Sequence, residues 1–214
     1  MTEPDATFDD IGIPFPLFEA PIREALEYLR SGDCDVCRTS SAHVFDLNMG
    51  TACYHCLRAR RARFPKYTSV GSVLDADLID ALDLSPNLIR EQGFENLEPH
   101  SLEPEWHTVR TAPGLLDELL VTPNFGCWSD CTWLFCCGQP MVYTGVWKAD
   151  RFSDHAGSTG VELFFNSVMV DECDRITDPN PTATWASDVL DGCGGPYVFR
   201  CKSCSSYRAN NDNP

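Results

Sequence analysis

Residues 34–56 read CDVCRTSSAHVFDLNMGTACYHC and contain two C-x2-C pairs, Cys34 with Cys37 and Cys53 with Cys56, separated by 15 residues. Each C-x2-C turn can direct two sulfur atoms at one ion about 2.3 Å away, and the excursion between the pairs is long enough for a hairpin. The spacing therefore predicts one four-thiolate zinc site of the ribbon or treble-clef kind. His43 is a spare nitrogen donor nearby, as is His55, but four thiolates already complete a tetrahedron.

Two further cysteine motifs lie in the last third of the chain. LFCCGQPM contains Cys136 and Cys137, and FRCKSC contains Cys201 and Cys204. This ligand set resembles that of small desulforedoxin-type iron or zinc sites, with the order of the pairs reversed. We therefore expect a second tetrahedral site made by all four cysteines and holding zinc or iron. In the competing arrangement, only one of the adjacent cysteines binds, and a water molecule or Cys193 completes the shell.

The remaining cysteines are Cys127, Cys131, Cys173 and Cys193. Cys127 and Cys131 could form half of a third metal site, because residues four apart on a strand point to the same face. Free cysteines are commonly small buried hydrophobic residues, and we favour this interpretation for all four. Twelve cysteines in a chain without an export signal also argue against a disulfide framework.

The composition predicts a globular cytoplasmic protein. Hydrophobic residues make up 43% of the 214 residues and aromatic residues 11%. No apolar run approaches the roughly 20 residues of a membrane span, and the acidic residues 1–10 are unlike a secretory or mitochondrial signal. The net charge of −16 should repel nucleic acid and anionic membranes and favour a basic protein partner. Taken alone, such acidity is more simply explained by solubility.

Hydrophobic periodicity predicts the secondary structure. We expect helices over 21–30, 72–84 and 114–121, and a helix rather than a buried strand over 161–170. A strand is expected at 43–47, and hairpins are expected at 127–147, around a CCGQP turn, and at 197–207. Residues 1–19 are expected to form an extended arm. The basic run LRARRARFPK, residues 57–66, is interpreted as a charged helix face rather than a phosphate contact.

These elements predict an α+β fold in which small antiparallel β-hairpins or sheets are stapled by two zinc-ribbon-like four-cysteine sites, with short peripheral helices. Residues 1–66 would contain the arm, a helix and the first cysteine pairs. Residues 67–122 would form an acidic helical and connecting region, and residues 123–214 a β-rich region with the second site. The three regions could also form one compact domain.

The sequence favours a non-enzymatic protein. An enzyme needs a nucleophile with a base, or a metal with an open coordination position, whereas fully thiolate sites are of the closed, structural kind. The most enzyme-like local group is Asp150, Asp154 and His155, near Gly157 and Gly160. A solvated loop explains that group more simply.

Several segments together resemble the CbrC family. They are the three C-x2-C pairs and the segments PLFEAPI (16–22), WLFCCGQPMVYTGVW (133–147) and YVFRCKSCSSYRA (197–209). The resemblance spans nearly the whole chain, although Ser205 stands where glycine is usual, and Cys127 and Cys131 look additional. The name of the family is tied to bacterial tolerance of a nuclease colicin. The resemblance therefore implies a role in defence against a toxin.

The resemblance and the charge together predict a metal-stabilised immunity or tolerance protein that binds and neutralises a bacterial toxin domain, such as a nuclease. Nuclease toxins tend to be basic at the substrate groove, so an acidic protein is steered towards them. The candidate binding surface is the acidic side of the predicted helix 72–84, with Asp75, Asp77, Asp80 and Asp83. The alternatives are a metal-dependent enzyme that modifies a target or a small molecule, and a zinc-binding adaptor in stress regulation.

Overall fold

The computed structural model describes residues 5–68, 71–73, 81–84, 97–99, 107–110, 114, 116–127, 132–156, 160, 163 and 196–210. These residues form a mixed α+β fold of small, mostly antiparallel sheets with few helices, which confirms the predicted fold class. The described elements are, in chain order, η1 (Ile22–Glu24), β1 (Tyr28–Asp33), β2 (Ser40–Asp46), β3 (Thr51–Cys53), α1 (Tyr54–Arg58), β4 (Lys66–Thr68), β5 (Gly71–Val73), β6 (Ala81–Leu84), β7 (Leu97–Pro99), β8 (His107–Arg110), α3 (Asp117–Val121), β9 (Thr132–Trp133), β10 (Phe135–Cys136), β11 (Gln139–Pro140), β12 (Val142–Val146), α4 (Ala149–Ala156), β13 (Tyr197–Arg200) and β14 (Tyr207–Asn210).

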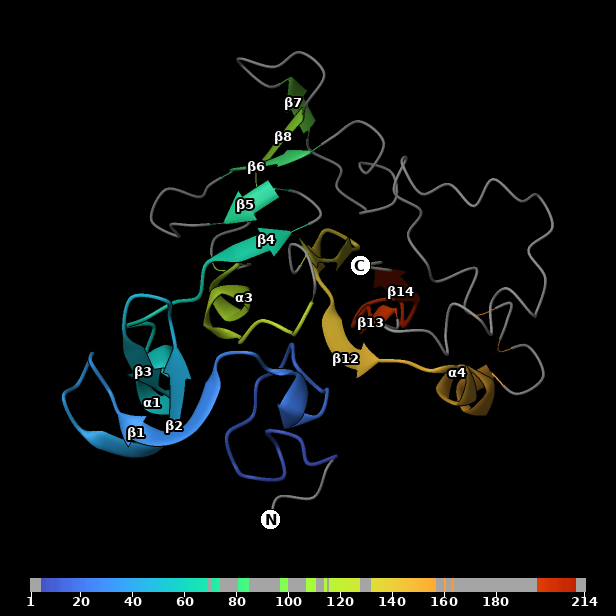
Figure 1. The fold of residues 1–214 in the computed structure, drawn as a ribbon. Helices are drawn as coiled ribbons and strands as arrows, with labels where there is room; N and C mark the ends of the chain where they lie inside the picture. The colour runs from blue at the N-terminus through green and yellow to red at the C-terminus, as the bar shows by residue number, and fades with distance from the viewer. Residues whose placement is uncertain are drawn as a thin grey trace.

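The described strands form five small sheets. Sheets β1-β2-β3, β12-β13-β14 and β6-β8-β7 are antiparallel, and β10 and β11 form a two-stranded hairpin. The sheet β5-β4-β9 contains the one parallel pair among these strands, β4 with β9. In Figure 1 the blue N-terminal segment lies between β1-β2-β3 with α1 on one side and β12-β13-β14 on the other.

The N-terminal segment packs into the core, so the predicted extended arm is wrong. Phe8, Phe15 and Phe18 are each at most 2% exposed. The Phe15 ring lies 5.5 Å from that of Phe45 in β2, and the Phe18 ring lies 5.2 Å from that of Tyr143 in β12. These aromatic side chains pack against both sheets and so join them. Burial of each side chain contributes about 1.5–3 kcal/mol to the stability of the fold.

A second aromatic group fills the core beneath β12 and β13. Phe125 stacks on Tyr143 at 4.5 Å between ring centroids, and Trp133 and Phe199 lie within 5.8 Å of Phe125. The indole of Trp133 donates a 2.9 Å hydrogen bond to the carbonyl oxygen of Met141, so its polar atom is satisfied in the interior. This core contains no metal ligand except Cys136 and Cys201 at its edge.

The hairpin predicted at 197–207 is confirmed, whereas the one predicted at 127–147 is confirmed only around its turn, because β12 pairs with β13 and β9 pairs with β4. Strand β2 contains residues 43–46 of the strand expected at 43–47, β10 and β11 form the two sides of the CCGQP turn, and β13 pairs with β14. Helix α3 lies within the helix expected at 114–121.

The helix expected over 21–30 is wrong. Only the single turn η1 forms there, and β1 begins at Tyr28, opposite Phe45 of β2. The second half of this segment instead forms β1, which pairs with β2. Helical spacing of the apolar residues does not reveal such a pairing, because strand formation depends on the partner strand.

The continuous acidic helix expected over 72–84 is also wrong. Strand β5 ends at Val73, and β6 occupies 81–84, where Asp83 stands opposite Thr108 of β8. Residues 74–80, which include Asp75, Asp77 and Asp80, lie outside the described residues, as does most of 161–170. Leucines spaced for a helix can equally supply a strand, and the long-range partner β8 decides between them.

The basic run after the first cluster is only partly a helix face. Helix α1 ends at Arg58, which forms an ion pair with Glu118 of α3, and Arg60 pairs with Asp117 at 2.6 Å. These contacts confirm that the run balances acidic neighbours. Lys66 differs, since it begins β4 and is fully buried.

Candidate metal centres

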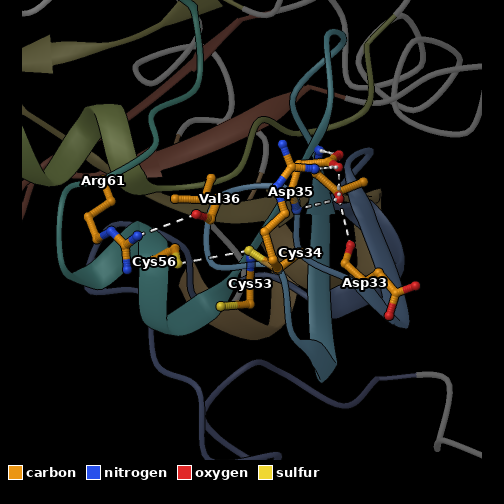
Figure 2. Close-up of polar contacts among 9 residues, drawn as sticks. Asp33, Cys34, Asp35, Val36, Cys53, Cys56 and Arg61 are labelled. Carbon is orange, nitrogen blue, oxygen red and sulfur yellow. Dashed lines mark hydrogen bonds and ion pairs between the residues drawn. The ribbon is translucent and has the colours of Figure 1, made fainter.

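The first four-cysteine cluster lies where β1, β3 and α1 meet. Cys34 directly follows β1, Cys53 ends β3 and Cys56 belongs to α1, while Cys37 lies in the turn between β1 and β2. Figure 2 shows Cys34, Cys53 and Cys56 close together, with Arg61 donating a 3.3 Å hydrogen bond to the carbonyl oxygen of Val36. The hairpin β2–β3 thus returns the second pair to the first, as the spacing predicts.

The sulfur positions in this cluster fit one tetrahedral metal ion. Cys34 Sγ lies 3.9 Å from Cys56 Sγ, and Cys37 Sγ lies 3.9 Å from Cys53 Sγ. A tetrahedron of sulfurs about 2.3 Å from zinc has edges of about 3.8 Å. The backbone N–H of Cys53 also donates to Cys34 Sγ at 3.2 Å, a contact that stabilises a thiolate.

The second cluster joins the hairpin β10–β11 to the hairpin β13–β14. Cys136 Sγ lies 3.8 Å from Cys137 Sγ and 3.6 Å from Cys204 Sγ. The four sulfurs, including that of Cys201, lie within 4.8 Å of one another, as do the four of the first cluster. All eight predicted cysteines therefore stand in two metal-binding arrangements.

The two C-x2-C turns that follow β1 and β13 have the same backbone geometry. The N–H of Cys34 donates to the carbonyl of Thr39, and the N–H of Cys201 donates to the carbonyl of Ser206, both at 2.9 Å. Arg38 and Ser205, one residue after each second cysteine, both have φ +61°. The left-handed conformation is one that glycine adopts without strain, so Ser205 occupies a position that favours glycine.

Adjacent cysteines can share one ion here because Cys136 precedes a tight turn and Cys137 is its first residue. Cys136 pairs with Gln139, which leaves Cys137 and Gly138 as a two-residue loop with φ +52° and +68°. Positive φ at both central residues is the requirement of a type I′ turn. The turn places the Cys137 sulfur 3.8 Å from the Cys136 sulfur.

The two clusters share a pattern of thiol acidity. The hydroxyl of Thr39, 3.0 Å from Cys37 Sγ, lowers the pKa of that thiol to about 6, and Ser206, 3.3 Å from Cys204 Sγ, likewise lowers its pKa to about 6. Burial raises the pKa of Cys56, and of Cys136, to about 12. Each cluster thus combines a thiol of lowered pKa with a thiol whose pKa burial raises, and a metal ion would displace protons from the buried thiols.

The histidines considered as substitute ligands are outside the first cluster. His43 Nδ1 instead lies 2.8 Å from the Tyr28 hydroxyl, within hydrogen-bonding distance. Cys127 is disulfide-bonded, so the expectation of a free thiol is wrong for this residue. Cys131, Cys173 and Cys193 lie outside the described residues.

The group Asp150, Asp154 and His155 lies on helix α4, not in a loop. Phe152 on the buried side of this helix packs 5.1 Å from Trp147, which explains the helix that sequence reasoning missed. Asp154 and His155 line a surface cleft. In the sequence, one apolar residue, Phe152, stands among charged residues of this segment. That pattern is the signal that could have predicted an amphipathic helix here.

Comparison with known proteins adds one match. The sequence model of a family described as uncharacterised, UPF0167, matches residues 92–213, which is more than half of the chain. The matched range contains the four cysteines of the second cluster and none of the first. Curated proteins and solved structures give no match, and no helix among the described residues has the length and apolar character to cross a bilayer. On the extent of its match, the chain belongs to the uncharacterised protein family UPF0167.

Proposed function

We propose that the protein is a metal-stapled binding protein whose two four-cysteine clusters each hold one structural zinc ion, and that it binds and neutralises a basic bacterial toxin domain. The observation that supports a structural role for the metal is the ligand set. Four sulfurs at tetrahedral spacing fill the coordination shell of zinc and leave no position for a substrate or water. Closed centres of this kind stabilise the fold and are not themselves catalytic.

The charge distribution supports a basic partner. The described structure pairs five arginines with carboxylates: Arg23 with Asp5, Arg38 with Asp35, Arg58 with Glu118, Arg60 with Asp117, and Arg200 with Glu19. Five of the sixteen basic side chains are thus paired within the protein, whose net charge is −16. A surface of this kind attracts a basic groove over about a Debye length.

The toxin assignment rests on the resemblance to the CbrC family and on this charge. We keep the acidic segment that contains Asp75, Asp77, Asp80 and Asp83 as the proposed steering surface. The test is surface plasmon resonance between the purified protein and the product of the neighbouring gene, at two salt concentrations. We expect the double reversal Asp75→Lys/Asp77→Lys to slow association and to weaken its dependence on salt.

A matched control separates local steering from net charge. Asp9→Lys/Asp46→Lys changes the net charge equally, at two aspartates that are exposed in the described part of the chain. Equal slowing by both double variants would remove this segment as the binding surface. Absence of binding by the unmutated protein at about 1 µM, a concentration at which a specific complex is readily detected, would remove the direct-inhibitor function. A metal centre with an exchangeable ligand would then favour the enzyme alternative, and a fully closed centre the adaptor.

A further inference from the structure

A cleft of about 370 Å³ lies beside helix α4, remote in the chain from the first metal cluster. Its lining comes from the N-terminal segment, β12, α4 and the hairpin β13–β14, and consists of Glu19, Thr144, Trp147, Arg151, Asp154, His155, Arg200 and Tyr207. The volume is at the lower end for ligand sites, so the cleft suits a small molecule.

One wall of the cleft is aromatic. The rings of Trp147, His155 and Tyr207 pack together with centroid distances of 4.7–5.4 Å. Trp147 is 3% exposed, and its Nε1 is buried without a hydrogen-bond partner. Tyr207 and His155 are the more accessible members of this wall, so they offer the aromatic surface to a ligand.

The charges in the cleft divide into one paired set and one unpaired set. Arg200 donates to both carboxylate oxygens of Glu19 at 2.8 and 2.9 Å, so these two groups neutralise each other. Arg151 lies over the Trp147 ring at 4.9 Å. Neither Arg151 nor Asp154 has an ion-pair partner within the described part of the chain.

Arg151 and Asp154 are also neighbours in space. They are three residues apart on α4, which places their side chains on the same side of the helix, about 5–6 Å apart at Cβ. The cleft therefore presents one cation and one anion, one helical turn apart, beside an aromatic wall. The ligand complementary to this arrangement carries an anionic and a cationic group close together.

We propose that the cleft binds a free amino acid. Its carboxylate would pair with the Arg151 guanidinium, and its ammonium group with the Asp154 carboxylate. Its side chain would lie against Tyr207 and His155. The site uses no ligand of either metal cluster and does not rest on the proposed toxin partner.

The test uses the full-length, metal-loaded protein and the twenty standard L-amino acids as probes. Saturation-transfer NMR at up to about 10 mM detects complexes with a dissociation constant of about 1 mM. We expect saturable binding of at least one amino acid. Its N-acetyl and C-terminal amide derivatives, which lack the ammonium or the carboxylate charge, should bind at least about tenfold more weakly.

Variants assign the binding to this cleft. Arg151→Gln and Asp154→Asn should each weaken the amino acid at least about tenfold, the effect of losing one charged contact. Asp150→Asn, on the same helix but outside the lining, should bind as the unmutated protein does, and all three should keep its melting temperature. The proposal is overturned if no amino acid binds, if the blocked derivatives bind equally well, or if the two cleft variants bind as Asp150→Asn does.

Discussion

Lys66 illustrates how single residues are governed by contacts distant in the sequence. Its Nζ donates a 2.6 Å hydrogen bond to Asn124 Oδ1, and Asn124 Nδ2 donates a 2.6 Å bond to Glu27 Oε1. Burial lowers the pKa of Lys66 to about 7 and raises that of Glu27. The partners are 58 and 97 residues apart in the chain, so the sequence offers a basic run and no hint that its last member is buried.

Replacing Lys66 by Met should change how stability depends on pH. Between a folded-state pKa of about 7 and the usual value of 10.5, the unfolded state binds one more proton than the folded state. The Lys66 contribution to the unfolding free energy therefore rises with pH across this window, by up to about 1.4 kcal/mol per pH unit. Denaturant unfolding of the metal-loaded protein from pH 7 to 10 measures the slope, which Lys66→Met should reduce. Identical slopes in the two proteins would contradict the burial of a neutral amine.

Ser205 provides a second test at the residue scale. Its φ of +61° is in the left-handed region that glycine adopts freely. We expect Ser205→Val to destabilise the protein by about 1–3 kcal/mol, because a β-branched residue is strained there, whereas Ser205→Gly should be neutral or stabilising. Thermal unfolding compares the two. Equal losses would mean that the serine side chain, and not the backbone conformation, matters.

At the scale of elements, turn chemistry was predictable and long-range pairing was not. The CCGQP turn and the C-x2-C turns carry local conformational requirements, so both C-terminal hairpins and the return of Cys53 and Cys56 follow from the sequence. The segments 21–30 and 72–84 have helical spacing but contribute to strands. Their partners, Phe45 for Tyr28 and Thr108 for Asp83, lie elsewhere in the chain. Local periodicity cannot encode such pairings.

The two metal centres differ in the exposure of their ligands. Cys137 and Cys204 are exposed in the second centre, whereas Cys37, half-buried, is the most accessible ligand of the first. A chelator attacks through accessible ligands, so we expect two phases of zinc release, with the second centre emptying first. A chromogenic chelator follows the release.

A variant identifies which centre releases first. Cys204→Ser removes one exposed ligand of the second centre and should abolish the fast phase while leaving the slow phase unchanged. Release in one phase from the unmutated protein, or a fast phase that survives in Cys204→Ser, would show that exposure does not set the order.

At the scale of the whole molecule, the first metal centre is separate from the aromatic core, whereas the second centre adjoins it through Cys136 and Cys201. The sulfurs of the first centre form their own small buried cluster with Val44, separate from the main core. The second centre links Cys136 to Cys204, 68 residues later, and so fixes a non-local pairing of two hairpins. The core that contains Phe125, Tyr143 and Phe199 also contains Cys136 and Cys201, so the second centre lies against it.

The central claim is that the two clusters each bind one zinc ion through four thiolates. The most direct measurement combines elemental analysis of protein purified without added metal with zinc X-ray absorption. The account predicts two zinc ions per chain, each with four sulfur neighbours at about 2.3 Å. One ion per chain, or a shell with nitrogen or oxygen in place of sulfur, would contradict it.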